Sequence, residues 1–175
     1  MDSSIKPKPL IGEILPGFTF LILALYSYLI VHPCQFNWIV SNGATTIAAS
    51  GLVFILAWII GDFFDSLRET VVETIWDWFS EIYWNFFFEA DSEKAEQLEN
   101  YYYSYYELSI NLAISIIIFL ISEILSHFFN PALMKPFSWW INLIFIFIAV
   151  IFFWDAKILR DEIKDIIDKE KAKTK

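Results

Sequence analysis

The chain has 175 residues, of which 57% are hydrophobic and 19% aromatic, and its formal net charge is −9. A soluble domain of this size does not bury so much apolar surface, so we expect lipid to be its solvent. The negative charge excludes nucleic acid as a partner, because the phosphates need Lys and Arg. The single cysteine, Cys34, excludes an internal disulfide and a cysteine-built metal cluster. No nucleotide or dinucleotide motif occurs, so we expect no cofactor.

Four apolar runs predict four transmembrane helices, each near the ~20 residues that a bilayer requires. Pro16 opens the first run, and Asn130-Pro131 follows the third. The expected fold is therefore an all-α, polytopic integral membrane protein with one membrane domain, residues 1–175. The predicted spans are about 14–31, 46–64, 104–129 and 137–154.

Between the second and third spans, residues 65–100 have an amphipathic pattern, which predicts a long cytoplasmic helical hairpin. Every fourth residue of its first half is acidic, so these acids share one arc of a helix: Asp65, Glu69, Glu73, Asp77 and Glu81. The opposite arc is apolar and is expected to lie at the membrane interface through Val71, Ile75, Trp78, Phe79 and Ile82. On this pattern, Glu73→Lys is expected to be nearly silent. A charged helix and tail, residues 155–175, end the chain.

The basic residues predict the orientation. Eleven of the twelve Lys and Arg lie before the first span, between the second and third, or after the fourth, and Lys135 alone lies on the opposite side. Because cytoplasmic loops carry an excess of Lys and Arg, both termini are expected in the cytoplasm. The expected location is the cell inner (plasma) membrane, crossed several times.

Charged and polar residues gather where the second, third and fourth spans meet the cytoplasm. Such groups are costly at that depth, and they persist where they pair or take part in function. Arg68 is a cation on the apolar arc, so we expect it to contact Asp65, with a further acid from a neighbouring span. The alternatives are a structural ion-pair cluster, a permeation or ligand site, and a metal site on carboxylates that share a face. The cluster comprises Asp62, Asp65, Arg68, Glu69, Glu107, Asn111, Asp155 and Arg160.

A polar stripe continues along the third span at helical spacing, through Ser104, Ser115, Ser122 and Ser126. Small residues in the second and fourth spans favour helix packing as its role, with a pore lining as the alternative. On the opposite side of the membrane, His32, Glu123 and His127 are weak candidates for a metal site, and no metal is predicted.

The sequence leaves two classes of function open. The first is a non-enzymatic small membrane protein, acting as an oligomeric pore or as the membrane-embedded subunit of a larger complex. Its partners would be the lipid bilayer and either copies of itself or another membrane protein. The alternative is a membrane-embedded enzyme or transferase that acts on a lipid-borne substrate through carboxylates and a metal at the cytoplasmic boundary.

Overall fold

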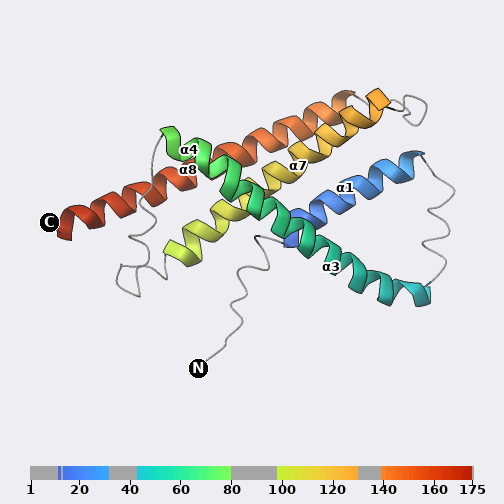
Figure 1. Ribbon diagram of the computed structural model, residues 1–175, viewed down its shortest axis with the longest axis horizontal. Helices are drawn as coiled ribbons and strands as arrows, with labels where there is room; N and C mark the ends of the chain where they lie inside the picture. Colours follow the sequence, from blue (N-terminus) through green and yellow to red (C-terminus); the bar gives the residue numbers. More distant parts are fainter. Residues whose placement is uncertain (1–11, 13, 32–42, 80–97, 130–138, 175) are drawn as a thin grey trace.

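The computed structural model describes residues 12, 14–31, 43–79, 98–129 and 139–174, and every element in these ranges is helical (Figure 1). The helices in chain order are α1 (Leu15–Val31), α3 (Gly43–Leu67), η2 (Arg68–Glu73), α4 (Thr74–Phe79), η3 (Leu98–Tyr103), α7 (Ser104–Phe129) and α8 (Trp139–Thr174). The elements η2 and η3 are π-helical. The all-α prediction is therefore confirmed for the described part of the chain.

Three segments are long and apolar enough to cross a membrane: Ser50–Trp78, Ser104–Ser126 and Trp140–Lys169. The first helix, α1, is also apolar, but its 17 residues make it shorter than these three. The protein is thus a helical membrane protein with three such helices and a shorter apolar one.

The helix of the second span continues into the predicted arm, as expected for one helix that leaves the bilayer. α3, η2 and α4 follow one another without a break from Gly43 to Phe79, so the first part of the predicted arm continues the span. The π-helical turn begins at Arg68, inside this continuous helix. Residues 80–97, which hold the tip of the predicted hairpin, lie outside the described residues.

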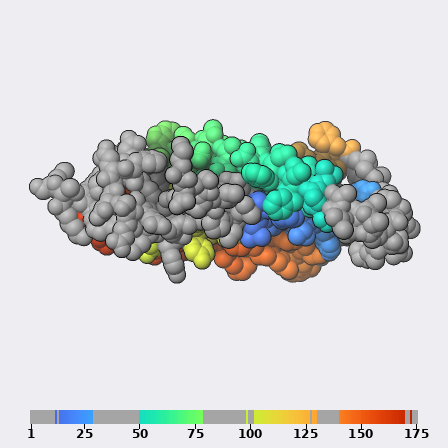
Figure 2. Space-filling view, turned by 90° about the horizontal axis from the view of Figure 1, so that it is seen from below, coloured from blue at the N-terminus to red at the C-terminus, as the bar shows by residue number. Residues whose placement is uncertain are grey.

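α7 is the central helix. It packs against α1, α3 and α8. More than half of its most apolar stretch is buried, whereas little of the corresponding stretch of the other two long helices is buried. α7 and α8 run side by side, and α3 crosses them (Figure 1). In the view of Figure 2, α3 and α8 lie along opposite edges of the molecule, with α1 between them. The outward faces of α3 and α8 are therefore available to lipid.

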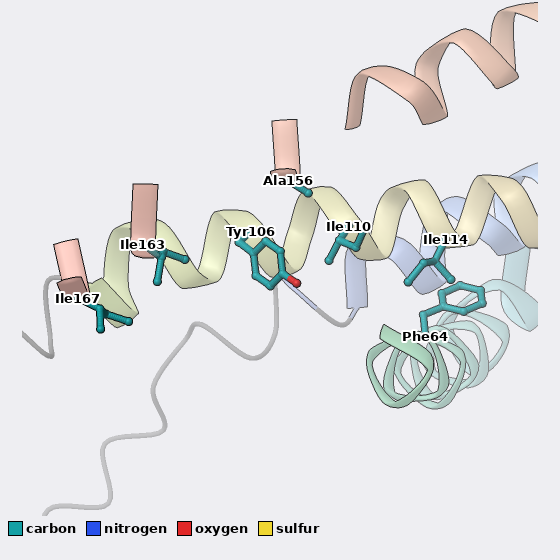
Figure 3. Packing of buried hydrophobic residues seen from close by; sticks show 7 residues of the cluster. All are labelled: Phe64, Tyr106, Ile110, Ile114, Ala156, Ile163 and Ile167. Atoms are coloured by element: carbon teal, nitrogen blue, oxygen red, sulfur yellow. The ribbon is translucent and has the colours of Figure 1, made fainter. Parts of the chain in front are cut away.

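Two apolar clusters hold the helices together. One joins α3, α7 and α8 and contains Phe64, Tyr106, Ile110, Ile114, Ala156, Ile163 and Ile167, which Figure 3 shows lying along α7. The other joins α1, α7 and α8 and contains Leu23, Ile116, Phe119, Leu120 and Ala149. In both clusters an alanine of α8 is buried among larger side chains, as the small-residue pattern of that span predicted.

Gly17 sets the distance between α1 and α3. A Cβ built on Gly17 would lie 1.8 Å from the carbonyl oxygen of Ala57 and 3.0 Å from the backbone nitrogen of Gly61. No side chain fits there, so the two backbones approach one another more closely than any residue larger than glycine allows. Ala57 and Gly61, two small residues of the second span, thus pack against α1.

Candidate functional site

Arg68 is the most enclosed charged residue among those described. Its exposed fraction is 0%, although it stands at the start of the π-helical turn near one end of the long second helix. A guanidinium without contact to solvent requires partners that satisfy its charge and its five N–H groups. The neighbouring carboxylates supply them.

Four carboxylates surround this cation. Asp65 Oδ1 accepts hydrogen bonds from Arg68 Nε at 3.0 Å and from Nη2 at 2.8 Å, as expected from their spacing of three residues. Glu107 of α7 accepts from Nη2 at 3.3 Å, which ties the second span to the third. Glu69 lies at 3.4 Å, with its side chain 61% exposed. Glu73 accepts a hydrogen bond from Nη1.

Aromatic rings and an amide complete the enclosure. The guanidinium carbon lies 5.7 Å from the ring centre of Tyr103 and 5.8 Å from that of Tyr106, within the range of a cation–π contact. Asn111, which is fully buried, donates from Nδ2 to Asp65 Oδ1 at 3.1 Å and to the carbonyl oxygen of Gly12 at 3.2 Å. Arg68 thus connects α3, η3 and α7. Asn111 connects α7 to the residues just before α1 through its hydrogen bond to Gly12.

The electrostatics of this group are strongly anionic, since four carboxylates face one guanidinium. Tyr103 responds to its surroundings: burial raises the pKa of its phenol, and the nearby Arg68 opposes this only in part. Its ring contributes the cation–π contact with Arg68 and lies 6.2 Å from the ring of Tyr106, centre to centre. The arrangement can fix a helix junction, and its excess of carboxylates is attractive to a proton or cation.

The structure overturns the expectation for Glu73. The helical wheel placed it on a solvent-facing acidic arc, but its side chain is only 15% exposed and binds Arg68. The reason is the π-helical register from Arg68 to Glu73. A π-helix pairs residue i with residue i+5, whereas the predicted wheel assumed 3.6 residues per turn. Glu73→Lys is therefore expected to be damaging and not silent.

The predicted boundary cluster divides into separate groups. Arg160 of α8 is buried and pairs with Asp77 of α4, and its guanidinium carbon lies 5.5 Å from the ring centre of Trp76. Asp155 accepts a hydrogen bond from Ser109 Oγ at 2.7 Å. Asp62 is exposed and makes no hydrogen bond or ion pair with another described residue. Five members of the predicted boundary cluster do lie together in the structure: Asp65, Arg68, Glu69, Glu107 and Asn111.

The polar stripe of α7 is buried over part of its length. Ser115 is fully buried and donates to the carbonyl oxygen of Leu112 at 2.8 Å, and Ser104 is partly buried. Ser122 donates to the carbonyl oxygen of Phe119 at 2.7 Å, and it is exposed, as is Ser126. The half nearest the Arg68 group therefore packs inside the chain, and the other half faces outward.

The predicted interface residues are exposed where they are described. Val71, Ile75 and Trp78 form an outward stripe, and Trp78 has an exposed fraction of 88%. The side chain of Phe79 and the whole of Ile82 lie outside the described residues. These three residues leave an apolar surface that requires lipid or a partner.

Two of the three weak candidates for a metal site lie outside the described part of the chain. Glu123 is partly buried on α7, whereas His32 and the side chain of His127 lie outside the described residues. Within the described ranges, no group of three or more His, Cys, Asp or Glu side chains is placed to hold a metal ion.

Sequence reasoning missed several partners of the two arginines. Glu73 was assigned to the wrong face, and Asp77 and Ser109 were not linked to Arg160 and Asp155. Asp77 lies on the predicted acidic arc, so the sequence indicated that it could pair with a cation. Which cation it pairs with depends on how each helix is rotated about its axis, and the sequence does not determine this rotation. Comparison of the chain with protein-family models, with curated proteins and with solved structures finds no match.

Proposed function

We propose that the protein is a non-enzymatic integral membrane protein that serves as the membrane-embedded subunit of a larger assembly, formed with its own copies or with another membrane protein. The observation that carries this proposal is the complete enclosure of Arg68 by side chains of its own chain. A group that binds or converts a substrate must be open to it, whereas this cation joins helices. The apolar stripe of Val71, Ile75 and Trp78 gives the assembly a surface.

The pore form of the hypothesis has less support. A pore lined by α7 requires Asn111 and Ser115 to face a symmetry axis between copies. Both residues are fully buried within one chain, and Asn111 is bonded to Asp65 and Gly12. The proposal is therefore an embedded subunit that contacts its partners through outward apolar faces.

The topology that goes with this proposal has four spans, with α1 as the short first one. In this topology the N- and C-termini and the segment 65–100, predicted to be a hairpin, lie in the cytoplasm, and the protein resides in the inner (plasma) membrane. The distribution of Lys and Arg, eleven against one, supports this orientation. The length of α1, 17 residues, is at the lower limit for a helix that crosses the hydrocarbon core.

One observation favours the alternative, an enzyme or transferase acting on a lipid-borne substrate. Four carboxylates approach a single guanidinium, which leaves an excess of negative charge, although no three of these described side chains are placed around a common metal position. This alternative requires Mg²⁺ or Mn²⁺ to bind the purified protein. Calorimetric titration with either ion, repeated on Asp65→Asn, tests it: binding that Asp65→Asn abolishes would favour the enzyme.

The assembly itself is tested by purifying the full chain in mild detergent, after chemical cross-linking in the native membrane. We expect a complex of defined mass larger than one chain, with either a second copy or one stoichiometric partner. Val71→Lys should dissociate it, because a cation replaces an apolar contact. Thr70→Lys, at the neighbouring exposed position, is the matched control and should leave it intact. A monomer without a cross-linked partner would contradict the proposal.

A further inference from the structure

The buried amide of Asn111 has an oxygen that accepts no hydrogen bond from the described part of the chain. The residue is fully buried, and its Nδ2 donates to Asp65 Oδ1 at 3.1 Å and to the carbonyl oxygen of Gly12 at 3.2 Å. Turning the amide over would bring Oδ1 against these two acceptors, so its orientation is fixed. Because a buried acceptor without a donor is costly, Oδ1 requires a donor.

The side chains next to this amide carry an excess of negative charge. Four carboxylates surround Arg68, and three of them belong to side chains that are at most 22% exposed: Asp65, Glu73 and Glu107. Water screens such charges poorly, so the imbalance is costly. Among the described residues, no three acidic side chains are placed to hold a metal ion. A single proton on one carboxyl would reduce the negative charge and also provide a donor for Asn111.

Glu107 is the carboxyl best placed to carry this proton. It precedes Asn111 by four residues on α7, so the two side chains lie one turn apart on the same face. Both also approach Gly12, since a Cβ built on Gly12 would lie 3.4 Å from Glu107 Oε2. Asp65 is unsuited, because its Oδ1 already accepts three hydrogen bonds, two of them from Arg68. Glu107 contacts Arg68 through Oε1, which is compatible with a proton on Oε2.

We propose that Glu107 is a proton-binding site and that its proton is donated from Oε2 to Asn111 Oδ1. The Glu107 side chain is 20% exposed, which gives the proton a route to water. The titratable and charged side chains around it are Asp65, Arg68, Glu69, Glu73 and Tyr103. Loss of the proton adds a negative charge and removes the donor to Asn111, so it weakens the contact between α3 and α7. The proposal does not rest on the assembly proposed above.

Infrared spectroscopy of the full chain in detergent tests the site, with the pH as the variable. A protonated carboxyl has a C=O stretching band separate from the bands of a carboxylate, and an ordinary glutamate, with a pKa of about 4.3, is ionised at about pH 7. We expect a carboxylic acid band in the wild type at about pH 7 that disappears at alkaline pH, and we expect Glu107→Gln to remove it. Asn111→Leu should shift the band to higher frequency, because the O–H group loses its acceptor. A wild type without this band, or a band that Glu107→Gln leaves unchanged, would overturn the proposal.

Thermal unfolding gives a second readout with matched variants. Glu107→Gln replaces a protonated carboxyl by an amide that donates the same hydrogen bond, so it should melt at the wild-type temperature at about pH 7. Asp65→Asn makes the same change at a carboxylate that accepts three hydrogen bonds, and it should melt lower.

Glu69→Gln is the control for both measurements, because its side chain is 61% exposed, and it should change neither the band nor the melting temperature. If Asn111→Leu does not fold, the spectra of the wild type and of Glu107→Gln still decide. A melting temperature for Glu107→Gln as low as that of Asp65→Asn would contradict the proposal. A band that Glu73→Gln removes and Glu107→Gln keeps would place the proton on Glu73 and also contradict it.

Discussion

Glu73 binds the guanidinium of Arg68 across five residues of one continuous helix, a contact that α-helical spacing does not provide. The π-helical turn between them places both side chains on the inner face of the bundle. The junction of the second span and its extension is therefore held by charges inside the protein.

Replacing Glu73 tests this contact directly. Glu73→Lys places a second cation beside a buried guanidinium, so we expect a loss of about 3–5 kcal/mol in the free energy of unfolding. Glu73→Gln keeps a hydrogen-bond acceptor and should lose less. Asp62→Lys makes the same kind of charge change at an exposed position of the same helix and should be nearly silent. Thermal unfolding in detergent measures all three, and equal melting temperatures for Glu73→Lys and Asp62→Lys would show that Glu73 does not hold Arg68.

Arg68 should be the most sensitive cation of the chain. Arg68→Ala leaves three partly buried carboxylates without their counter-charge, which is expected to cost about 3–5 kcal/mol. Arg68→Lys should restore part of this, because one ammonium cannot reproduce the several directed contacts of the guanidinium. Lys169→Ala, which removes an exposed cation from α8, serves as the control. If Arg68→Ala melts at the same temperature as the wild type, Arg68 does not stabilise the fold.

The close crossing of α1 and α3 predicts opposite effects for two glycines. Gly17→Ala forces the Cβ against the carbonyl oxygen of Ala57, so the helices must separate, at a cost of about 1–3 kcal/mol. Gly51→Ala adds a Cβ with no atom within 4 Å, and it should stabilise α3 by up to about 1 kcal/mol because alanine favours helix. Unfolding of the two variants side by side gives the comparison. A neutral Gly17→Ala would mean that the two helices are free to move apart.

The raised pKa of Tyr103 predicts a dependence on alkaline pH. The folded chain holds the phenolic proton more tightly than the unfolded chain, whose tyrosine pKa is about 10. The stability that comes with this proton is present below about pH 10 and is lost as the pH rises above it. Tyr103→Phe cannot ionise and should therefore lose less stability between pH 9 and pH 11 (roughly the range around that reference pKa). Identical alkaline slopes for Tyr103→Phe and the wild type would contradict this.

Accessibility labelling checks the orientation. In a Cys34→Ser background, Asn42→Cys should react with a membrane-impermeant maleimide from outside the cell. Glu93→Cys and Lys171→Cys should react only after the membrane is opened. External labelling of Glu93→Cys would reverse the arrangement, because the eleven basic residues would then lie outside.

The positions of the helices could be predicted from the sequence, but the rotation of each helix about its own axis could not. Long apolar runs ending in Asn-Pro or in charge predicted α7 and the continuous α8 closely. A cation on an apolar arc also predicted that Arg68 contacts Asp65 and an acid of a neighbouring span, here Glu107. The wheel for residues 65–87 failed at Glu73 because a periodic pattern carries no sign of a π-helical turn. The pairing of Arg160 with Asp77 was not predictable, since several acids were equally close in the pattern.

The continuous α8 has a mechanical consequence. Its 36 residues form a rod about 54 Å long, which begins in apolar sequence and ends in charged sequence. Ala156, Ile163 and Ile167 on its charged part belong to the same apolar cluster as Ile110 and Ile114 of α7. A tilt imposed on the charged end is therefore transmitted to the central helix without a joint in between. Cutting the chain after Trp154 would also remove three of the seven members of that cluster, so the membrane helices cannot be isolated from the extension as an independent folding unit.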